Sequence, residues 1–372
     1  MLLMTGNSIQ MNPINTNEFE TAAQQKLNIP IYDYIASGAG DEYTLKRNTT
    51  SFEHIQIIPR LFGSTSTVTT EIELFQQFLS QPVFVSPMAF HSLVNPLGET
   101  TTVAAINEIG IGMTVSTLSS VSLEDVATAA TCPLWFQLYI YKDRAITQEL
   151  IRRAERAGYS ALVVTVDTPI MGKRERDISN QFKLPDGVSA KNLVNQQLDL
   201  ICSDKAGSNV KNYTDDLFDR TLTWKDMEWI QSETKLPVIL KGVMHEDDAA
   251  MALNLNVSAI IISNHGGRQL DGMPATIEVL PEIAKRVAKK IPILIDGGFR
   301  RGTDIFKAIA LGADCIMVGR PVLWALACNG KDGIKRLFDI YHTELIEAMI
   351  LCGCSTIEDV TKYGRNMMRF SK

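Results

Sequence analysis

The residues best suited to chemistry follow a short apolar run in the second half of the chain. Residues 259–262 are apolar throughout and predict a buried strand, after which come His265, a glycine pair and Arg268. Histidine titrates near neutral pH and can take up a proton, whereas arginine stays charged and can bind a carboxylate through two parallel hydrogen bonds. The spacing indicates a general base beside an anion-binding group. The alternative is a capped loop with a structurally satisfied histidine.

Eight apolar runs of this kind recur along the chain, with amphipathic segments between them. The runs are Pro82–Ser86, Gly112–Ser116, Trp135–Ile140, Ala161–Val166, Pro237–Lys241, Ala259–Ser263, Pro292–Asp296 and Cys315–Gly319. The amphipathic segments include Thr100–Ile109, Ala145–Ala157, Asp247–Leu255, Ile277–Lys289 and Thr303–Leu311. This alternation predicts parallel β/α units, and eight strands close a TIM (β/α)8 barrel. An open doubly wound sheet is the alternative, but it would more usually begin with a phosphate-binding glycine loop, and Gly38-Ala-Gly40 follows no strand.

Polar side chains stand at the C-terminal end of every predicted strand, where the active sites of such barrels lie. After the seventh and eighth strands, the glycines of 296–298 and Gly319 allow close approach of backbone amides to an anion. Arg300, Arg301 and Arg320 add positive charge there, and both turns precede helices. Together these features favour a phosphorylated cofactor, although either turn alone would equally suit a tight turn with surface arginines.

Two further strand ends carry charged residues with more than one possible role. Lys241 ends an apolar strand and needs an anionic partner, either as a Schiff-base lysine or beside a negatively charged cofactor ring. Asp167 and Thr165 alternate onto one face of the fourth strand, so that Asp167 can orient His265, or else cap the following helix.

The flanking segments predict a lead-in, a lid and a tail around the barrel. Residues 1–15 suit a loose arm, Asn17–Leu27 a helix, and 31–40 a second helix that ends at glycine. We expect residues 1–80 to form the arm and lead-in, 81–355 the barrel, and 356–372 a C-terminal tail. The long connection Asp167–Leu236 predicts a mobile lid at about 172–222, with Trp224–Glu233 as the helix before the fifth strand.

The composition limits the classes of function. A net charge of −6 without a dominant basic block argues against nucleic acid as a partner. No Cys-x-x-Cys or His-Glu-x-x-His pattern indicates a metal site, and no apolar run is long enough for a transmembrane helix. We therefore expect a soluble, cytoplasmic protein that acts on small molecules and does not bind membranes. Its last residues, Phe370-Ser371-Lys372, are unlike the Ser-Lys-Leu peroxisomal signal.

Five stretches carry a resemblance to a known family. They begin at Tyr32 (YDYIASGA), Trp135 (WFQLY), Thr165 (TVDTP), Ser263 (SNHGGRQLD) and Asp296 (DGGFRRGTD). In this order they resemble the FMN-dependent L-2-hydroxy-acid oxidases, the family of glycolate and lactate oxidases, from about Phe19 to about Cys352. The resemblance implies FMN at the mouth of a TIM barrel.

Carried over position by position, the resemblance also implies roles for individual residues. Arg300 and Arg320, with Asp296 and the Gly298 and Gly319 amides, would form the phosphate end of the FMN site. Residues on the isoalloxazine side would be Pro87, Met88, Ala89, Ser116, Gln137, Thr165 and Ser263. Lys241 would lie near N1 and O2 of the ring, which displaces the Schiff-base interpretation. His265 would be the base, Asp167 would orient it, and the substrate would contact Arg174, Arg268, Tyr34 and Tyr139.

Two positions depart from the plant glycolate oxidases that the chain resembles. Leu118 and Met88 stand where those enzymes carry Trp and Thr, which leaves room for a methyl group and favours L-lactate over glycolate as a preference. Glycolate or a longer 2-hydroxy acid is the alternative substrate. With no haem domain expected before the barrel, O2 is the expected acceptor, and a dehydrogenase with another acceptor is the alternative. The family resemblance implies a homotetramer, and an FMN-free binding barrel is the competing class.

Overall fold

The sequence folds around one closed sheet of eight parallel strands. A computed structural model describes residues 13–61, 63, 65–196 and 217–371. The barrel strands are β4 (Val83–Val85), β5 (Gly112–Ser116), β6 (Leu134–Leu138), β7 (Ala161–Thr165), β8 (Val238–Val243), β9 (Ala259–Ile262), β10 (Ile293–Ile295) and β11 (Cys315–Val318). Each pairs in parallel with its neighbours in chain order, and β11 closes the barrel against β4. The predicted TIM barrel is confirmed, each strand overlapping one of the eight predicted runs.

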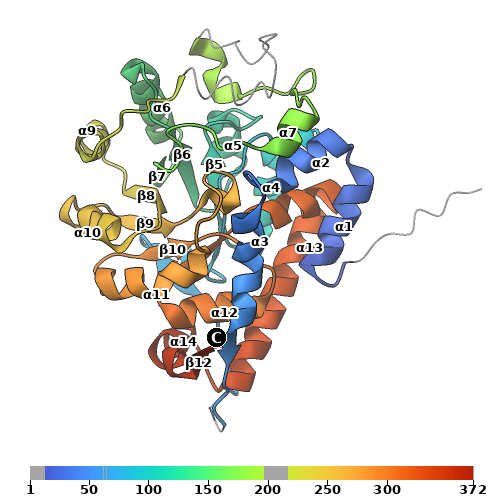
Figure 1. Cartoon of the computed structure of the whole chain (residues 1–372), viewed down its shortest axis with the longest axis vertical. Coiled ribbons are helices and arrows are strands. Elements are labelled where there is room, and N and C mark those ends of the chain that lie inside the picture. Colours follow the sequence, from blue (N-terminus) through green and yellow to red (C-terminus); the bar gives the residue numbers. More distant parts are fainter. Residues whose placement is uncertain (1–12, 62, 64, 197–216, 372) are drawn as a thin grey trace, which may run out of the picture.

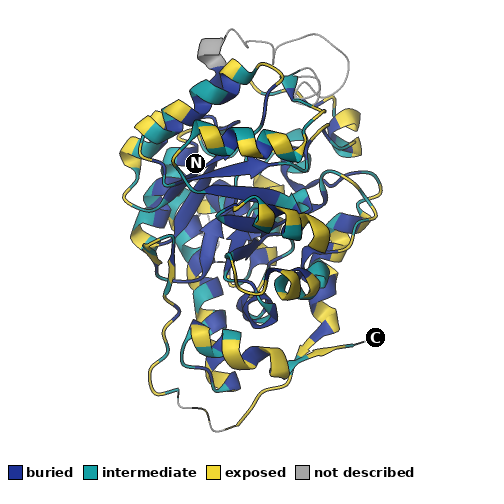
Figure 2. Ribbon diagram, turned by 90° about the vertical axis from the view of Figure 1, so that its left-hand side faces the viewer, coloured by how far each residue is buried: buried dark blue, intermediate teal, exposed yellow. Residues whose placement is uncertain are grey.

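Alternation along the strands builds the core in two layers. One side chain in two along each strand, among them Phe84, Trp135 and Ile261, points into the barrel. There the Phe84 and Trp135 rings stack with their centroids 4.1 Å apart. The intervening side chains point outward and pack under the surrounding helices. In Figure 2 the buried strands fill the middle of the molecule, and the exposed faces of the helices lie outside.

Helices connect the strands and cover the barrel (Figure 1). They are α4 (Glu99–Ile109), α5 (Leu123–Ala129), α6 (Arg144–Arg156), α7 (Glu175–Ser179), α9 (Trp224–Glu233), α10 (Glu246–Asn254), α11 (Thr276–Val287), α12 (Gly302–Leu311) and α13 (Arg320–Cys352). α13 is kinked where Asn329 and Gly330 leave the helical region. Short 3₁₀ turns occur at Ser51–His54, His91–Leu93, Lys191–Gln196, His265–Gly267 and Gly364–Met367.

The lead-in consists of three helices, two of them anticipated. They are α1 (Thr16–Lys26), α2 (Ile29–Ala36) and α3 (Tyr43–Thr50). The expectation that the second helix runs to glycine is wrong, because Ser37 leaves the helix in an extended conformation with ψ 153°. This early end turns the carbonyls of Ile35 and Ser37 toward two arginines of the barrel mouth.

The remaining strands lie outside the barrel. The hairpin β2 (Ile72–Leu74) and β3 (Gln77–Leu79) contributes Leu74 and Leu79 to the inner core layer. After residue 355 the chain forms α14 (Ile357–Tyr363) and β12 (Met368–Phe370), and β12 pairs antiparallel with β1 (Ile55–Ile57). Residues 1–12 of the expected arm and 197–216 of the expected lid lie outside the described residues. Within the described part, no helix has the length and apolar character needed to cross a membrane.

Candidate active site

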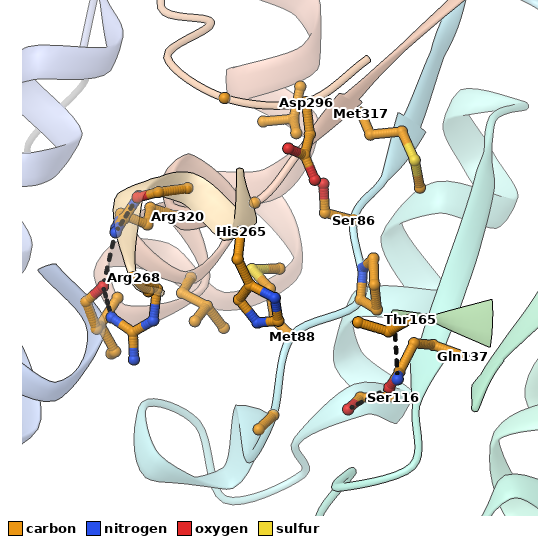
Figure 3. Close-up of a pocket in the computed structure, with 18 of the residues that line it drawn as sticks. Ser86, Met88, Ser116, Gln137, Thr165, His265, Arg268, Asp296, Met317 and Arg320 are labelled. Carbon is orange, nitrogen blue, oxygen red and sulfur yellow. Dashed lines mark hydrogen bonds between the residues drawn. The ribbon is translucent and has the colours of Figure 1, made fainter. Parts of the chain in front are cut away.

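A cavity opens at the C-terminal ends of the barrel strands, and residues from all eight strand ends line it. It holds about 1110 Å³ of empty space, part of it open to solvent. Its wall includes most of the residues singled out from the sequence: Tyr34, Pro87, Met88, Ala89, Ser116, Leu118, Gln137, Tyr139, Thr165, Arg174, Lys241, His265, Arg268, Asp296, Gly298, Arg300, Gly319 and Arg320. Figure 3 shows the His265 ring in this cavity, with Arg268 and Arg320 to one side and Ser116, Gln137 and Thr165 to the other.

Two of the residues singled out lie behind the wall and bond to residues on it. The Asp167 carboxylate bonds the His265 ring, and the Ser263 hydroxyl bonds Lys241. Gly297, one of the two glycines expected to approach an anion after the seventh strand, also lines the cavity. The structure adds wall residues that sequence reasoning missed: Ile35, Ser86, Met171, Gly266, Phe299, Met317, Val318, Pro321 and Leu323. Most are apolar, and only their closeness to the predicted strand ends could have indicated them. Arg301, by contrast, faces away and pairs with Glu344.

His265 and Asp167 form a base and its orienting carboxylate. Nδ1 of His265 lies 2.8 Å from Oδ1 of Asp167. Because a carboxylate only accepts hydrogen bonds, the neutral ring carries its proton on Nδ1 and keeps Nε2 as an acceptor. Burial lowers the pKa of His265, outweighing the opposite effect of Asp167, while Lys241 and Arg174 lower it further. A neutral imidazole at neutral pH can therefore take up a proton in this cavity.

The backbone that presents His265 adopts a conformation rare for residues other than glycine. His265, Gly266 and Gly267 have φ values of 55°, 64° and 73°, all in the left-handed region. For a residue with a Cβ this conformation is costly and persists only where the surroundings enforce it. At Gly267 an added Cβ would lie 2.6 Å from the backbone nitrogen of Leu45, so α3 packs directly against this turn. The turn fixes His265 and Arg268 relative to the lead-in.

Lys241 is a buried ammonium with two partners. Its Nζ donates to the Ser263 hydroxyl at 2.7 Å and lies 3.2 Å from a carboxylate oxygen of Asp296. Burial alone would lower the pKa of Lys241, but the charges of Asp296 and Asp167 more than offset it and leave the pKa raised. The side chain thus keeps its positive charge, which argues against a Schiff-base role, since that role needs a neutral amine.

Four guanidinium groups share the cavity without a carboxylate partner. Arg174, Arg268, Arg300 and Arg320 line it, and within the described ranges none of them makes an ion pair with an acid. Arg320 instead donates to the carbonyls of Ile35, Ser37 and Gly266, and Arg268 donates to the first two of these. The group therefore has the chemistry of a site for more than one anionic group.

The pKa values of two of these arginines are lowered, as expected for buried cations near other cations. Burial and the charge of Arg268 lower the pKa of Arg174 to about 10, and its Nε has no hydrogen-bond partner among the residues that the structure describes. Burial and the charges of Arg268, Arg300 and Arg174 hold the pKa of Arg320 well below its ordinary value. An anionic ligand would relieve both effects.

Two tyrosines, the buried Tyr34 and the partly buried Tyr139, complete the wall near Arg174. Tyr34 stacks on Phe182 at 4.4 Å, and Tyr139 stacks on Phe218 at 4.3 Å. Burial raises the pKa of both hydroxyls, so each stays protonated and can donate a hydrogen bond. In the described ranges, no group of three or more His, Cys, Asp or Glu side chains could hold a metal ion.

Comparison with known proteins identifies the family to which this chain belongs. The family model described as FMN-dependent dehydrogenase matches residues 23–366. The chain belongs to this family of FMN-dependent enzymes. Its relatives include a 2-hydroxyacid oxidase of Dictyostelium discoideum, 43% identical over 93% of this chain and 88% of the relative. An L-lactate oxidase of Nostoc sp. is 44% identical over 94% and 97%, and glycolate oxidase 1 of rice (Oryza sativa subsp. indica) is 43% identical over 94% of each chain.

Solved structures agree with the sequence relatives. A mandelate oxidase with (S)-4-hydroxymandelic acid superposes with a TM-score of 0.91 at 40% identity and covers 94% of this chain and 98% of that one. The protein is therefore an FMN-dependent enzyme of the 2-hydroxy-acid oxidase type.

The cavity of this FMN-dependent enzyme fits its cofactor. Ser116, Gln137 and Thr165 form a hydrogen-bonded row along the wall, with Ser116 donating to Gln137 at 3.3 Å and Gln137 donating to Thr165 at 3.1 Å. Within the described part of the chain, the buried Ser86 Oγ and Asp296 Oδ1 lack hydrogen-bond partners. Such orphaned groups are costly unless a ligand satisfies them. A ring with polar edges and a phosphate matches this set of donors, acceptors and cations.

Gly298 has a packing role as well as its place on the cavity wall. Its φ is 84°, and an added Cβ would lie 1.8 Å from the Asn48 carbonyl oxygen. The close approach of α3 therefore requires glycine at this position, whether or not its amide also contacts a phosphate.

Proposed function

We propose that this enzyme oxidises L-lactate to pyruvate with FMN and passes the electrons to O2, which yields hydrogen peroxide. The observation that carries the proposal is the neutral His265, held by Asp167 in the same cavity as two arginines that pair with no acid among the described residues. A 2-hydroxy acid offers the matching chemistry, a carboxylate to bind beside a carbon that can lose a proton and two electrons.

The FMN-binding roles follow from the chemistry of the wall. Arg300 and Arg320, with the amides of Gly298 and Gly319, would hold the phosphate, and Asp296 would keep Lys241 in place. The rest of the FMN site would be Pro87, Met88, Ala89, Ser116, Gln137, Thr165 and Ser263, the last of them through Lys241. The ammonium of Lys241 would favour negative charge on the neighbouring edge of the ring. When bound, FMN supplies a two-electron acceptor that O2 reoxidises.

The chain's own residues bind the substrate and move its proton. Arg174 and Arg268 would bind the carboxylate, and the protonated hydroxyls of Tyr34 and Tyr139 would donate to substrate oxygens. Converting the CH–OH group to a carbonyl removes two electrons and two protons. Nε2 of His265 takes one proton, and the two electrons together with the other proton would pass to the bound FMN. Asp167 stabilises the imidazolium that forms, and the proton on Nε2 comes from either the hydroxyl or the α-carbon.

Leu118 and Met88 support a small alkyl side chain on the substrate. Leu118 is buried and Met88 partly buried, and both line the cavity with apolar atoms. A methyl group gains from burial there, whereas glycolate has none to bury. Because one methylene group is worth only about 1–3 kcal/mol, we expect a preference for L-lactate, with glycolate and longer acids as slower substrates.

A substrate panel tests the proposal. The purified yellow protein would be assayed for oxygen uptake and peroxide release with L-lactate, D-lactate, glycolate and L-2-hydroxybutanoate. The highest kcat/KM with L-lactate, and none with D-lactate, is expected. The highest value with glycolate or the longer acid would overturn the choice of lactate, and flavin reduction without oxygen uptake would indicate a dehydrogenase. Light scattering would test the expected homotetramer.

A further inference from the structure

A buried acid that the proposed mechanism does not use lies beside the cavity. Glu99 is the first residue of α4 and is 0% exposed. It forms no ion pair within the described part of the chain. Its Oε1 accepts from the backbone nitrogens of His91 at 3.1 Å and Ser120 at 2.9 Å, and its Oε2 accepts from the Ser120 hydroxyl at 2.7 Å. Hydrogen bonds thus satisfy the carboxylate in place of a counter-charge.

The donors belong to two loops that form the substrate end of the wall. One loop, residues 86–93, follows β4 and carries Met88, and the other, residues 117–121, follows β5 and carries Leu118. Two further hydrogen bonds join the loops directly, from the Phe90 nitrogen to the Leu118 carbonyl at 3.2 Å and from the Ser92 nitrogen to the Ser120 hydroxyl at 2.9 Å. Glu99 therefore holds the two loops in register with each other.

Loss of the carboxylate would leave this junction unsatisfied. Two buried backbone N–H groups and one hydroxyl would lose their acceptor, and a buried donor without a partner is costly enough to drive local rearrangement. The loops can regain partners only by moving, and Met88 and Leu118 would move with them. Ser116 is less free to follow, since the Asn192 side chain donates to the carbonyls of Ser116 and Thr117 from the other side.

We propose that Glu99 is a positioning residue that sets the enzyme's preference for substrate size by holding Met88 and Leu118 at a fixed separation. The inference rests on the proposed function, since it concerns the side-chain pocket of a 2-hydroxy acid. It predicts that Glu99 acts on the choice among substrates and leaves the base, His265, unchanged.

The test compares kcat/KM for L-lactate with kcat/KM for L-2-hydroxybutanoate. Glu99→Ala is expected to shift this ratio at least fivefold toward the longer acid, through KM more than kcat, when both enzymes are assayed fully loaded with flavin. Glu99→Gln keeps an oxygen for both backbone donors and places an amide that can donate to Ser120, so its ratio should stay within twofold of the wild type.

Two more variants make the result decisive. Asn107→Ala removes three more exposed hydrogen bonds at the other end of α4, to residues 129, 131 and 132, and should leave the ratio unchanged. Ser120→Ala removes one bond to Glu99 and also the Ser92–Ser120 bond between the loops, but it keeps both backbone bonds to Glu99. It should shift the ratio in the same direction by a smaller factor, which decides the matter if Glu99→Ala does not fold. An unchanged ratio in folded, yellow Glu99→Ala or Ser120→Ala, or an equal shift in Asn107→Ala, would overturn the inference.

The wild-type panel separates this inference from the proposed function. A wild-type enzyme that oxidises no 2-hydroxy acid refutes the proposed function. In that case the inference is read from binding of pyruvate and 2-oxobutanoate, followed by the change in flavin absorbance, and an unchanged affinity ratio in Glu99→Ala would overturn it. A wild-type enzyme that prefers another 2-hydroxy acid refutes only the choice of lactate, and the ratio between variant and wild type still tests Glu99.

Discussion

At the scale of single residues, His265 combines a left-handed backbone conformation with a side chain whose pKa is lowered. Its Nε2 is the acceptor left over after Nδ1 bonds Asp167. General-base catalysis is worth about 10²–10⁴ in rate, so we expect His265→Ala to lose flavin-reduction rate by that factor. The variant should still bind FMN. Rapid mixing with L-lactate without oxygen measures the loss, and a rate near that of the wild type would contradict the assignment.

The pH dependence of kcat/KM reports the same base. Burial lowers the pKa of His265 beneath its ordinary 6.5, so the ring is neutral at pH 7 and becomes protonated only in more acidic solution. Activity should therefore be flat through neutral pH and fall on an acidic limb whose midpoint lies below 6.5. A pH profile of kcat/KM for the free enzyme checks this. A midpoint above 7 would mean that a group other than neutral His265 controls the reaction.

The sequence indicated the charged site residues better than their partners. His265, Lys241 and Arg320 follow apolar runs, and their chemical types suggest roles wherever strand ends converge. The Ile35 and Ser37 carbonyls that receive Arg268 and Arg320 gave no such signal, because backbone atoms from a distant helix end carry no side-chain pattern. Thr168, which bonds Asp167, was missed for a related reason, since a threonine after a strand suits many turns.

At the scale of elements, the turn at 265–267 and the helix α3 depend on each other. Gly267→Ala would place a Cβ 2.6 Å from the Leu45 nitrogen at a φ of 73°, where the backbone alone costs about 1–2 kcal/mol. We expect a lower Tm and a large fall in kcat/KM, because His265 and Arg268 would move. Gly158→Ala is the matched control, with φ 84° and no atom within 4 Å, and should lose stability without comparable loss of activity. Equal losses of activity would argue against this coupling.

Elements were predictable where periodicity is strong and less so where packing decides. β5 matches its predicted run from Gly112 to Ser116, because a parallel strand covered on both faces is buried along its whole length. The end of α2 was misplaced, because the chain leaves the helix at Ser37 and not at a later glycine. There the Ser37 carbonyl accepts a hydrogen bond from Arg268 at the barrel mouth. The bulge at Gly242 had no sequence signal beyond the glycine itself, yet it lets β8 approach Asp167 closely.

At the scale of the whole molecule, the four cavity arginines place several positive charges in one cavity, which bound anions would stabilise. Their mutual repulsion is a cost that FMN should relieve, and ligand at 100 times its Kd adds about 2.7 kcal/mol to the free energy of unfolding. We expect removal of FMN to lower the Tm, and inorganic phosphate to restore part of it beyond the effect of chloride at equal ionic strength. Thermal unfolding measures both.

A matched variant separates this effect from general charge screening. Arg301 pairs with Glu344 outside the cavity, so Arg301→Gln should retain the response to phosphate. Equal effects of phosphate and chloride on the apoprotein would contradict a phosphate site at the barrel mouth.

The closed barrel was predictable from the count of eight runs, because eight parallel β/α units close into a barrel. The closed sheet then brings the C-terminal ends of all its strands to one site. Substrate preference was harder to predict, since it depends on loop positions set by contacts such as those of Glu99, which the linear chain does not reveal.

The most direct test of the proposed function is a single experiment on the purified enzyme. The yellow protein is mixed with L-lactate without oxygen while the flavin absorbance is followed, and O2 is then admitted while peroxide is quantified. The account predicts rapid bleaching, then full recovery of the absorbance with one peroxide formed for each pyruvate. A flavin that L-lactate does not bleach, or that stays bleached in O2, would contradict it.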